Sequence, residues 1–464
     1  MTILQKANQK VAALLRPGKR KEGQEYRLTR YLLRREAEGG VLFFNTLTCE
    51  LLLLTPEEAA DALNNDELLR RGFVVPADYD EMRRAGSMRE LLRASEPPRK
   101  ETTSYLVYTT LDCNARCYYC YEADHPHCYM SKEMALKTAA YMAEHCGGKK
   151  IHISWFGGEP LCNAAAMDTI CTELKNRGVE YECSMISNSY LFDDEAAEKA
   201  VDLWHIGNIQ VTLDGTEEVY NRTKAYVAAG NTSPFRIVLD NIGRMLDHNI
   251  RASIRLNVSD ENAEDLGNLI DQLCERFGGR EGFSIYTHIL FSYDDGDLET
   301  RDRVIKKETV LREKLRGYGI RYTDNGGKLP RSMRLHHCMA DRASTLNIHP
   351  DGKTGCCEHY YNSDFTGTLD SEERDEAVLA AFREQIDELP RCSTCSVYPQ
   401  CVLLKKCAEH KCFESTVTNM EEEILRGMGA AYARYMEKLK EKKAEEEENG
   451  AEENPQTDTE ESCT

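Results

Sequence analysis

Long hydrophobic runs are missing from this sequence. It has no stretch of about 20 consecutive apolar residues, the length that a helix needs to span a membrane. Residues 1–21 mix apolar, polar and basic side chains and lack the apolar segment of a secretory signal peptide. We therefore expect no membrane association and a cytoplasmic location.

An excess of basic residues is missing as well. The formal net charge is −20, from 59 Lys and Arg residues against 79 Asp and Glu residues. A general nucleic-acid binder needs a basic surface that displaces counterions from the phosphate backbone, so we expect no nucleic-acid partner. Nine of the acidic residues lie in the segment 445–461, which has little apolar content. We expect this tail to be disordered and solvated.

Cysteine, by contrast, is abundant, with 19 residues. In a reducing compartment these are not expected to form a disulfide framework, and their clustering points to metal binding. The first cluster is Cys113-x3-Cys117-x2-Cys120. Three thiolates can ligate three irons of a cubane iron–sulfur cluster and leave the fourth iron open for a small molecule. A structural zinc site is the alternative, but such sites usually take two Cys pairs, and no second pair follows nearby.

The triplet, with Tyr119 just before its last cysteine, resembles the signature of the radical S-adenosylmethionine (SAM) enzymes. The resemblance implies that the open iron chelates the amino and carboxylate groups of SAM. It also implies that one electron from the cluster cleaves SAM, giving a 5′-deoxyadenosyl radical that removes a hydrogen atom from the substrate. Because exposed clusters of this kind react with oxygen, the resemblance also predicts an anaerobic setting.

Between residues 104 and 324, predicted strands alternate with predicted helices. Six successive βα units favour a parallel sheet with right-handed crossovers, and the resemblance makes this a partial (β/α)6 barrel of the α/β class. Active sites of such barrels lie at the carboxyl ends of the strands, and the cysteine triplet directly follows the first one. The strands are expected at 104–111, 150–156, 181–187, 208–213, 251–258 and 283–291, and the helices at 131–146, 163–177, 194–205, 235–248, 262–277 and 299–318.

Candidate SAM-binding residues follow the other strand ends. Gly157-Gly158-Glu159-Pro160 resembles the family motif for the SAM amino group, since glycines permit close backbone approach and a carboxylate can accept hydrogen bonds from an ammonium. By the same resemblance, Tyr119 would lie against the adenine. Ser187 and Asp214 also suit the caps of following helices. The remaining candidates are Ser187 and Asn188 near the ribose, Thr212 and Asp214 after the fourth strand, and Arg255, whose guanidinium can pair with the SAM carboxylate.

A second group of cysteines, starting at Cys338, resembles the SPASM extension, which carries two auxiliary 4Fe–4S clusters. With the SAM-binding cluster, this implies three 4Fe–4S clusters. The chain departs from the pattern in two ways: five residues separate Cys401 from Cys407, where the family usually has three, and the first auxiliary cluster lacks an obvious fourth ligand unless Cys356 serves. An open iron there could bind a substrate thiolate. A zinc ribbon over 392–412 is the alternative. Carried over by order, the first cluster takes Cys338, Cys357 and Cys407, and the second takes Cys392, Cys395, Cys401 and Cys412.

Residues 24–97 are predicted to form a small separate module. Short strands are expected at 26–34, 41–44 and 50–54, and Thr55-Pro56 opens a helix with Thr55 as its N-cap. Strands followed by helices resemble the winged-helix peptide-recognition element of peptide-modifying radical SAM enzymes. If the function holds, a leader peptide would add a strand to the sheet edge. An ordinary scaffold domain is the alternative.

These features together predict a radical SAM/SPASM peptide maturase. Its substrate would be a ribosomally made precursor with a leader peptide, and the favoured product is a Cys-to-carbon thioether, as in sactipeptide or ranthipeptide maturation. Carbon–carbon crosslinking, Cys or Ser oxidation as in sulfatase maturases, and electron transfer without SAM chemistry are the alternatives. A ferredoxin or flavodoxin would donate electrons. The expected domains are a peptide-recognition-like module at 1–100, the barrel at 101–325, the auxiliary-cluster domain at 326–415, and a helix with an acidic tail at 416–464.

Overall fold

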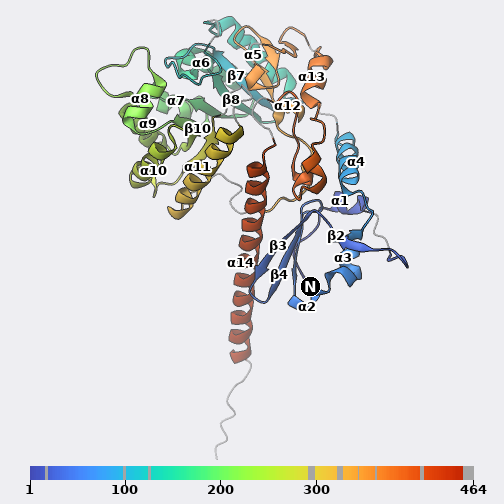
Figure 1. Ribbon diagram of the computed structural model, residues 1–464. Helices are drawn as coiled ribbons and strands as arrows, with labels where there is room; N and C mark the ends of the chain where they lie inside the picture. The colour runs from blue at the N-terminus through green and yellow to red at the C-terminus, as the bar shows by residue number, and fades with distance from the viewer. Residues whose placement is uncertain are drawn as a thin grey trace, which may run out of the picture.

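The computed structural model describes residues 1–15, 19–97, 101–123, 127–290, 298–320, 328–342, 344–360, 363–371, 373–407 and 412–452. Within these ranges the chain forms an α/β barrel-like body, a small N-terminal module, a cysteine-rich segment and a long C-terminal helix (Figure 1). No helix among these residues is long and apolar enough to cross a membrane.

The central sheet confirms the predicted α/β class. Its six parallel strands follow one another in chain order, and each is hydrogen-bonded to the next. Alternate side chains such as Ile151, Ile153 and Trp155 are fully buried against the helices that cover the sheet. The strands are β7 (Ser104–Thr110), β8 (Ile151–Gly157), β9 (Tyr181–Ser187), β10 (Ile206–Leu213), β11 (Arg251–Val258) and β12 (Phe283–Ile289).

Seven helices accompany these strands among the described residues. Six lie close to the predicted ranges. The seventh, α8, follows β10 directly and was not predicted, because its eight residues are too few to show a clear helical period. The helices are α5 (Lys132–His145), α6 (Ala164–Asn176), α7 (Asp194–Asp202), α8 (Glu217–Lys224), α9 (Pro234–Asp247), α10 (Ala263–Phe277) and α11 (Leu298–Gly317).

The cysteine-rich segment extends the same sheet. Strand β13 (Leu346–Ile348) pairs in parallel with β7, and β14 (Lys353–Gly355) and β15 (Gly367–Thr368) continue antiparallel, giving nine strands. Two short helices, α12 (Met339–Arg342) and α13 (Glu376–Arg383), flank these strands. The segment that carries the second cysteine group is therefore hydrogen-bonded to the first barrel strand.

The N-terminal module is built on a four-stranded antiparallel sheet in the order β1-β5-β4-β3. The single strand expected over 26–34 is in fact two strands in different sheets, because the chain turns at 29–31. Thr55 is the N-cap of the helix that follows it, as predicted, and it forms a capping box with Glu58. The elements are β1 (Thr2–Gln5), α1 (Gln9–Leu14), β2 (Tyr26–Leu28), β3 (Leu32–Ala37), β4 (Gly40–Asn45), β5 (Glu50–Leu54), α2 (Pro56–Ala60), α3 (Asp66–Arg70), β6 (Val74–Pro76) and α4 (Glu81–Ala94).

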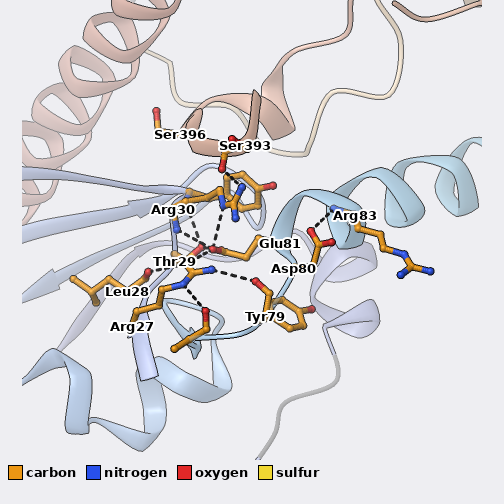
Figure 2. A network of polar contacts seen from close by, with 12 residues as sticks. Arg27, Leu28, Thr29, Arg30, Tyr79, Asp80, Glu81, Arg83, Ser393 and Ser396 are labelled. Carbon is orange, nitrogen blue, oxygen red and sulfur yellow. Dashed lines mark hydrogen bonds and ion pairs between the residues drawn. The ribbon is translucent and has the colours of Figure 1, made fainter. Parts of the chain in front are cut away.

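A buried carboxylate links this module to the cysteine-rich segment (Figure 2). Glu81, at the start of α4, forms ion pairs with Arg27 at 2.5 Å and Arg30 at 3.4 Å and accepts a hydrogen bond from Thr29. Arg30 in turn donates to the backbone carbonyl of Ser393. The module is thereby fixed beside the loop that carries Cys392 and Cys395.

The C-terminal helix α14 (Glu414–Glu452) runs between the module and the barrel (Figure 1). Arg35 of β3 donates to the carbonyl of Leu425 at 2.6 Å, and Arg312 of α11 pairs with Glu423 at 3.1 Å. The helix continues past residue 445, where we expected a disordered tail, so that boundary was wrong. Residues 453–464 of the expected tail lie outside the described residues.

Candidate active site

A cavity of about 850 Å³ opens at the carboxyl ends of the parallel strands. The three cysteines of the triplet line it, and so do most of the residues that we expected to bind SAM. Glu122, directly beyond the triplet, and His359, two residues after Cys357, line it as well. The predicted residues in the lining are Cys113, Cys117, Tyr119, Cys120, Gly157, Gly158, Ser187, Asn188, Thr212 and Arg255.

The loop that carries the triplet is held from both sides. On one side, the Asp112 carboxylate accepts a hydrogen bond from the Cys113 backbone N–H at 2.9 Å. On the other, the Asn188 side chain, at the end of β9, donates to the Asn114 side chain at 2.6 Å and lies 3.8 Å from Cys113 Sγ. The backbone of Arg116 donates to the carbonyl of Lys224, at the end of α8. Strand ends and a helix end therefore fix the loop together.

The two glycines after β8 are required by crowding between backbones. A Cβ on Gly157 would lie 2.2 Å from the carbonyl oxygen of Thr110, and φ is +118° there. A Cβ on Gly158 would lie 2.1 Å from the carbonyl oxygen of Asp112. Only glycine lets the end of β8 approach the triplet loop this closely. The same approach exposes the glycine backbone to the cavity.

Glu159 lies behind the cavity wall instead of lining it. Its carboxylate is fully buried and accepts hydrogen bonds from the Leu161 backbone at 3.1 Å, the Ser187 hydroxyl at 2.8 Å and the Asn188 backbone at 2.8 Å. Burial raises the pKa of Glu159 to about 7 in spite of these bonds. Donors from the protein thus occupy this carboxylate, which holds the end of β9, and the expected contact between the carboxylate and the SAM ammonium stays a prediction. Pro160 is also buried outside the cavity lining.

Asp214 belongs to a buried charged triad. It pairs with Lys224 at 3.1 Å and accepts hydrogen bonds from the Tyr119 hydroxyl at 2.9 Å and the Asn257 amide at 3.1 Å. Lys224 also donates to the Tyr119 hydroxyl at 3.0 Å. Although burial opposes its charge, Asp214 together with Tyr119 and Cys117 holds the pKa of Lys224 well above its usual range. Asp214 therefore acts from behind the wall, and it fixes Tyr119, which lines the cavity.

Sequence reasoning missed Lys224. Its signal was its place at the end of a short helix after the Thr212–Gly215 segment, but one lysine in a polar stretch is usually solvated. Here the side chain is only 5% exposed, and it lines the cavity. The Tyr220 ring lies 5.9 Å from Lys224 Nζ and packs in turn against Phe235.

The donor set of the triplet fits an iron–sulfur cluster. Burial raises the pKa of Cys113 to about 12 and that of Cys120 to about 11, so both stay protonated near neutral pH unless a metal displaces the proton. The Ala115 backbone N–H approaches Cys113 Sγ at 3.4 Å, the kind of N–H···S contact that cluster ligands receive. Among the described residues no three His, Cys, Asp or Glu side chains converge on a single metal ion. A cubane cluster, by contrast, spreads its ligands over four irons.

Comparison with known proteins agrees with this geometry. The family model described as the Radical SAM superfamily matches residues 107–273. Residues 107–273 form a radical SAM domain. A curated relative, the GTP 3′,8-cyclase of Clostridium perfringens (strain 13 / Type A), is 24% identical over 310 residues, which cover 62% of this chain and 90% of the relative.

Solved structures share the fold of this radical SAM domain and its surroundings. The structure "Native anSMEcpe with bound AdoMet" superposes with a TM-score of 0.56 at 13% identity, covering 71% of this chain and 99% of that one. The structure of the same protein with AdoMet and the Cp18Cys peptide has a TM-score of 0.55, with the same identity and coverage. At such low identity the likeness shows the fold alone.

The cysteines of the second group, from Cys338 onward, lie near one another in two groups. Cys338 is close enough to Cys407 for their charges to interact, and Cys357 is similarly close to Cys338 and Cys356. Separately, Cys401 lies within electrostatic range of Cys392, Cys395 and Cys412. The sets are thus spatially distinct in the way that the order of the cysteines predicted; the ligand assignments themselves stay a prediction.

Cys356, beside Cys357 of the first set, has apolar neighbours. Its side chain is buried and packs with Ala340, Leu379 and Phe382 in a small cluster, against which Cys357 also packs. His337, next to Cys338, also approaches the set: its Nδ1 lies 2.7 Å from the carbonyl oxygen of Val402, and its Nε2 lies 3.7 Å from Cys407 Sγ. Whether Cys356 ligates a cluster stays a prediction.

Proposed function

We propose that this protein is a radical SAM enzyme that forms Cys-to-carbon thioether crosslinks in a ribosomally made precursor peptide. One observation carries the proposal. A single cavity is lined by the cysteine triplet and also by His359, which is two residues after Cys357 of the first auxiliary set. Tyr121, next to Cys120, packs against the His359 ring at 4.7 Å. A substrate in this cavity would meet both the SAM site and the first auxiliary set.

Residues of this chain would hold SAM in the part of the cavity beside the cysteine triplet. The Gly157 and Gly158 backbone would face its amino group, and Arg255 would pair with its carboxylate through a two-pronged guanidinium contact. Asp214 and Lys224 would hold the Tyr119 ring against the adenine. When bound, the SAM-ligating cluster supplies the electron that cleaves SAM and so begins hydrogen abstraction from the peptide.

The first auxiliary cysteine set would receive the sulfur of the substrate. Cys338, Cys357 and Cys407 would hold the first auxiliary cluster, while the apolar packing around Cys356 favours leaving a fourth position for a substrate thiolate. Cys392, Cys395, Cys401 and Cys412 would hold the second. A ferredoxin or flavodoxin would supply electrons. That the Cp18Cys peptide binds to anSMEcpe, which shares this fold, supports a peptide as the substrate.

The leader peptide would bind to the N-terminal module. In its sheet the two edge strands are β1 and β3, and α14 contacts β3. A peptide strand would add to a free edge through main-chain hydrogen bonds. The domain boundaries predicted from the sequence belong to this proposal, as does the identification of 326–415 as a SPASM domain.

Mass spectrometry of the reacted peptide tests the reaction type. The reconstituted, reduced enzyme would be incubated with SAM and with the product of a short Cys-rich open reading frame, to be sought beside its gene. We expect the peptide to lose two hydrogens and its cysteine to resist alkylation. A cysteine that still alkylates after the loss of two hydrogens would instead indicate carbon–carbon crosslinking or another oxidation.

A second assay separates an enzyme from an electron carrier. A radical SAM enzyme releases 5′-deoxyadenosine from SAM, whereas a multi-cluster electron-transfer protein does not. We expect the wild-type protein to form 5′-deoxyadenosine and the triple variant C113A/C117A/C120A to form none. Product formation by the triple variant would overturn the assignment of the SAM site.

A further inference from the structure

A second large cavity, of about 700 Å³, lies between the N-terminal module, the cysteine-rich segment and α14. Its walls come from the end of α4, from residues 328–336, from Gln400 and from one face of α14. It is distinct from the SAM cavity, with which it shares no lining residue. We call it the basic pocket; its charged lining residues are Glu96, Lys328, Arg334, His336, Arg342, Glu423 and Arg426.

Both acidic residues of the basic pocket already contact another side chain. The Glu96 carboxylate lies 2.6 Å from His336 Nε2, and Glu423 pairs with Arg312 of α11 at 3.1 Å. The four Lys and Arg residues of the lining outnumber these two carboxylates.

The Lys and Arg side chains of the basic pocket have few such partners in the described parts of the chain. Within those parts, Arg334 donates only to the backbone carbonyls of His336 and His337, which carry no net charge. Arg426 is 3.8 Å from exposed Glu422, a weak pair one helical turn away. Lys328 and Arg342 form no ion pair with any residue that the structure describes. A protein of net charge −20 thus presents a local excess of positive charge in a concave site.

Apolar side chains complete the basic pocket. Leu329, Met333 and Leu335 are among its lining residues, and so are Met420 and Ile424 of α14, which pack with Leu329. An occupant that combines carboxylates with aliphatic side chains would match both features. Such a mixture is typical of an acidic, amphipathic peptide segment and not of a small inorganic anion.

The basic pocket also opens beside the sheet of the N-terminal module. Gln5, the last residue of edge strand β1, donates to the carbonyl of Pro330 at 2.7 Å, and Asn8 donates to the carbonyl of Arg331 at 3.1 Å. Pro330 lines the pocket. The pocket wall at Pro330 is therefore in direct contact with the end of this edge strand.

We propose that the basic pocket binds an acidic segment of the precursor peptide, with its carboxylates at Lys328, Arg334, Arg342 and Arg426. This deepens the proposed function and rests on it only for the identity of the peptide. The pocket holds the peptide by charge and apolar contact, while the SAM cavity carries the chemistry. Ionic contacts of this kind weaken as salt screens them.

Fluorescence anisotropy of the cluster-loaded enzyme tests the proposal. The probe is a fluorescein-labelled peptide of about ten alternating Glu and Leu residues, and its partner replaces every Glu by Gln. We expect the R342E/R426E variant to bind the Glu peptide at least about 10-fold more weakly than the wild type, at low salt. The control R434E reverses an exposed arginine of the same helix outside the pocket and should change affinity less than about 2-fold.

Three results would overturn the proposal: equal affinity of wild type and R342E/R426E, equal weakening by R434E, or equal binding of the Gln peptide. SAM cleavage to 5′-deoxyadenosine without peptide should be the same in all variants, which shows that they fold. If the precursor is modified, the Glu peptide should inhibit that reaction competitively. If no precursor is modified at all, the proposed function fails, while the binding assay still decides on the pocket.

Discussion

At the residue scale, Lys224 and Asp214 form a buried ion pair whose partners depend on each other. Replacing Lys224 by Ala leaves the Asp214 charge buried without its cation, which typically costs about 3–5 kcal/mol of stability. We expect a clearly lower thermal unfolding midpoint for K224A and weaker SAM binding, because Tyr119 also loses a hydrogen bond. The midpoint would be measured by scanning calorimetry at constant cluster content.

Two matched variants make this prediction specific. K199A removes a lysine that is 32% exposed and pairs with Asp168 and Glu195, so it should cost less than about 1 kcal/mol. The double variant D214N/K224M removes both buried charges and should recover much of the lost stability, although not SAM binding. Equal unfolding midpoints for K224A and K199A would show that the Asp214–Lys224 pair does not stabilise the fold.

Glu159 predicts a specific pH dependence. Its pKa is about 7 in the folded chain and about 4.5 in an unfolded one, so the protonated carboxyl favours the folded state. This contribution is fully present below about pH 4.5 and is lost as the pH rises through about 7. The shift corresponds to about 3 kcal/mol over that range, since one pKa unit is about 1.4 kcal/mol.

The variant E159Q should remove this dependence. We expect the difference in unfolding midpoint between wild type and E159Q to change steadily from pH 5 to pH 7.5. The control E182Q changes an exposed carboxylate on β9. Contacts with Lys150 and His152 lower the pKa of Glu182, so the difference in unfolding midpoint between wild type and E182Q should not change with pH above pH 5. A flat difference for E159Q as well would mean that Glu159 stays ionised throughout.

At the element scale, the turn between β2 and β3 docks the N-terminal module onto the cysteine loop. Arg30 carries both contacts, one with buried Glu81 and one with the Ser393 carbonyl. Because hydrogen bonds to charged groups contribute about 1.5–3 kcal/mol, R30A should loosen this docking measurably. Hydrogen exchange of residues 392–396 should become faster. R34A, which removes an exposed arginine of β3 paired with Glu36, should leave that exchange unchanged.

The elements that the sequence predicted well are those with a strong local signal. Strands such as 181–187 and 251–258 alternate apolar and polar residues, and the structure has them at the predicted positions. The helix that starts after Thr55 was predictable from Thr55 as its N-cap and Pro56 at its first position. The break at residues 29–31 was not, because Thr29 is turned by tertiary contact with Glu81 and not by a turn residue.

The sequence predicted which residues lie at the site better than it predicted which way their side chains point. Strand-end motifs placed Gly157, Ser187 and Arg255 at one edge of the sheet, and all three line the cavity. The sequence could not show that Glu159 turns away from it, since this depends on donors from Ser187 and Asn188, far along the chain. Lys224 was not identified from the sequence for the same reason: only the folded structure brings it to Asp214 and Tyr119.

At the scale of the whole molecule, the second auxiliary cysteine set also lies at the docking surface of the N-terminal module. Thr46 of the module donates to the Ser396 carbonyl at 2.5 Å, and Gln400 donates back to the Thr46 carbonyl at 2.7 Å. Tyr31 stacks on Tyr398 at 6.5 Å. A cluster held by this loop would therefore order the surface that receives the module.

Removing either cysteine set should consequently have different long-range effects. The variant C392A/C395A/C401A/C412A should lose about four irons and also show faster hydrogen exchange in residues 26–46, because the loop that docks the module loses its cluster. The control C113A/C117A/C120A should lose about four irons and all 5′-deoxyadenosine formation, yet leave exchange in 26–46 unchanged, since the triplet contacts the barrel and not the module. Equal exchange in the two variants would contradict the link between the second cluster and the module, and iron loss without faster exchange would assign the docking to protein contacts alone.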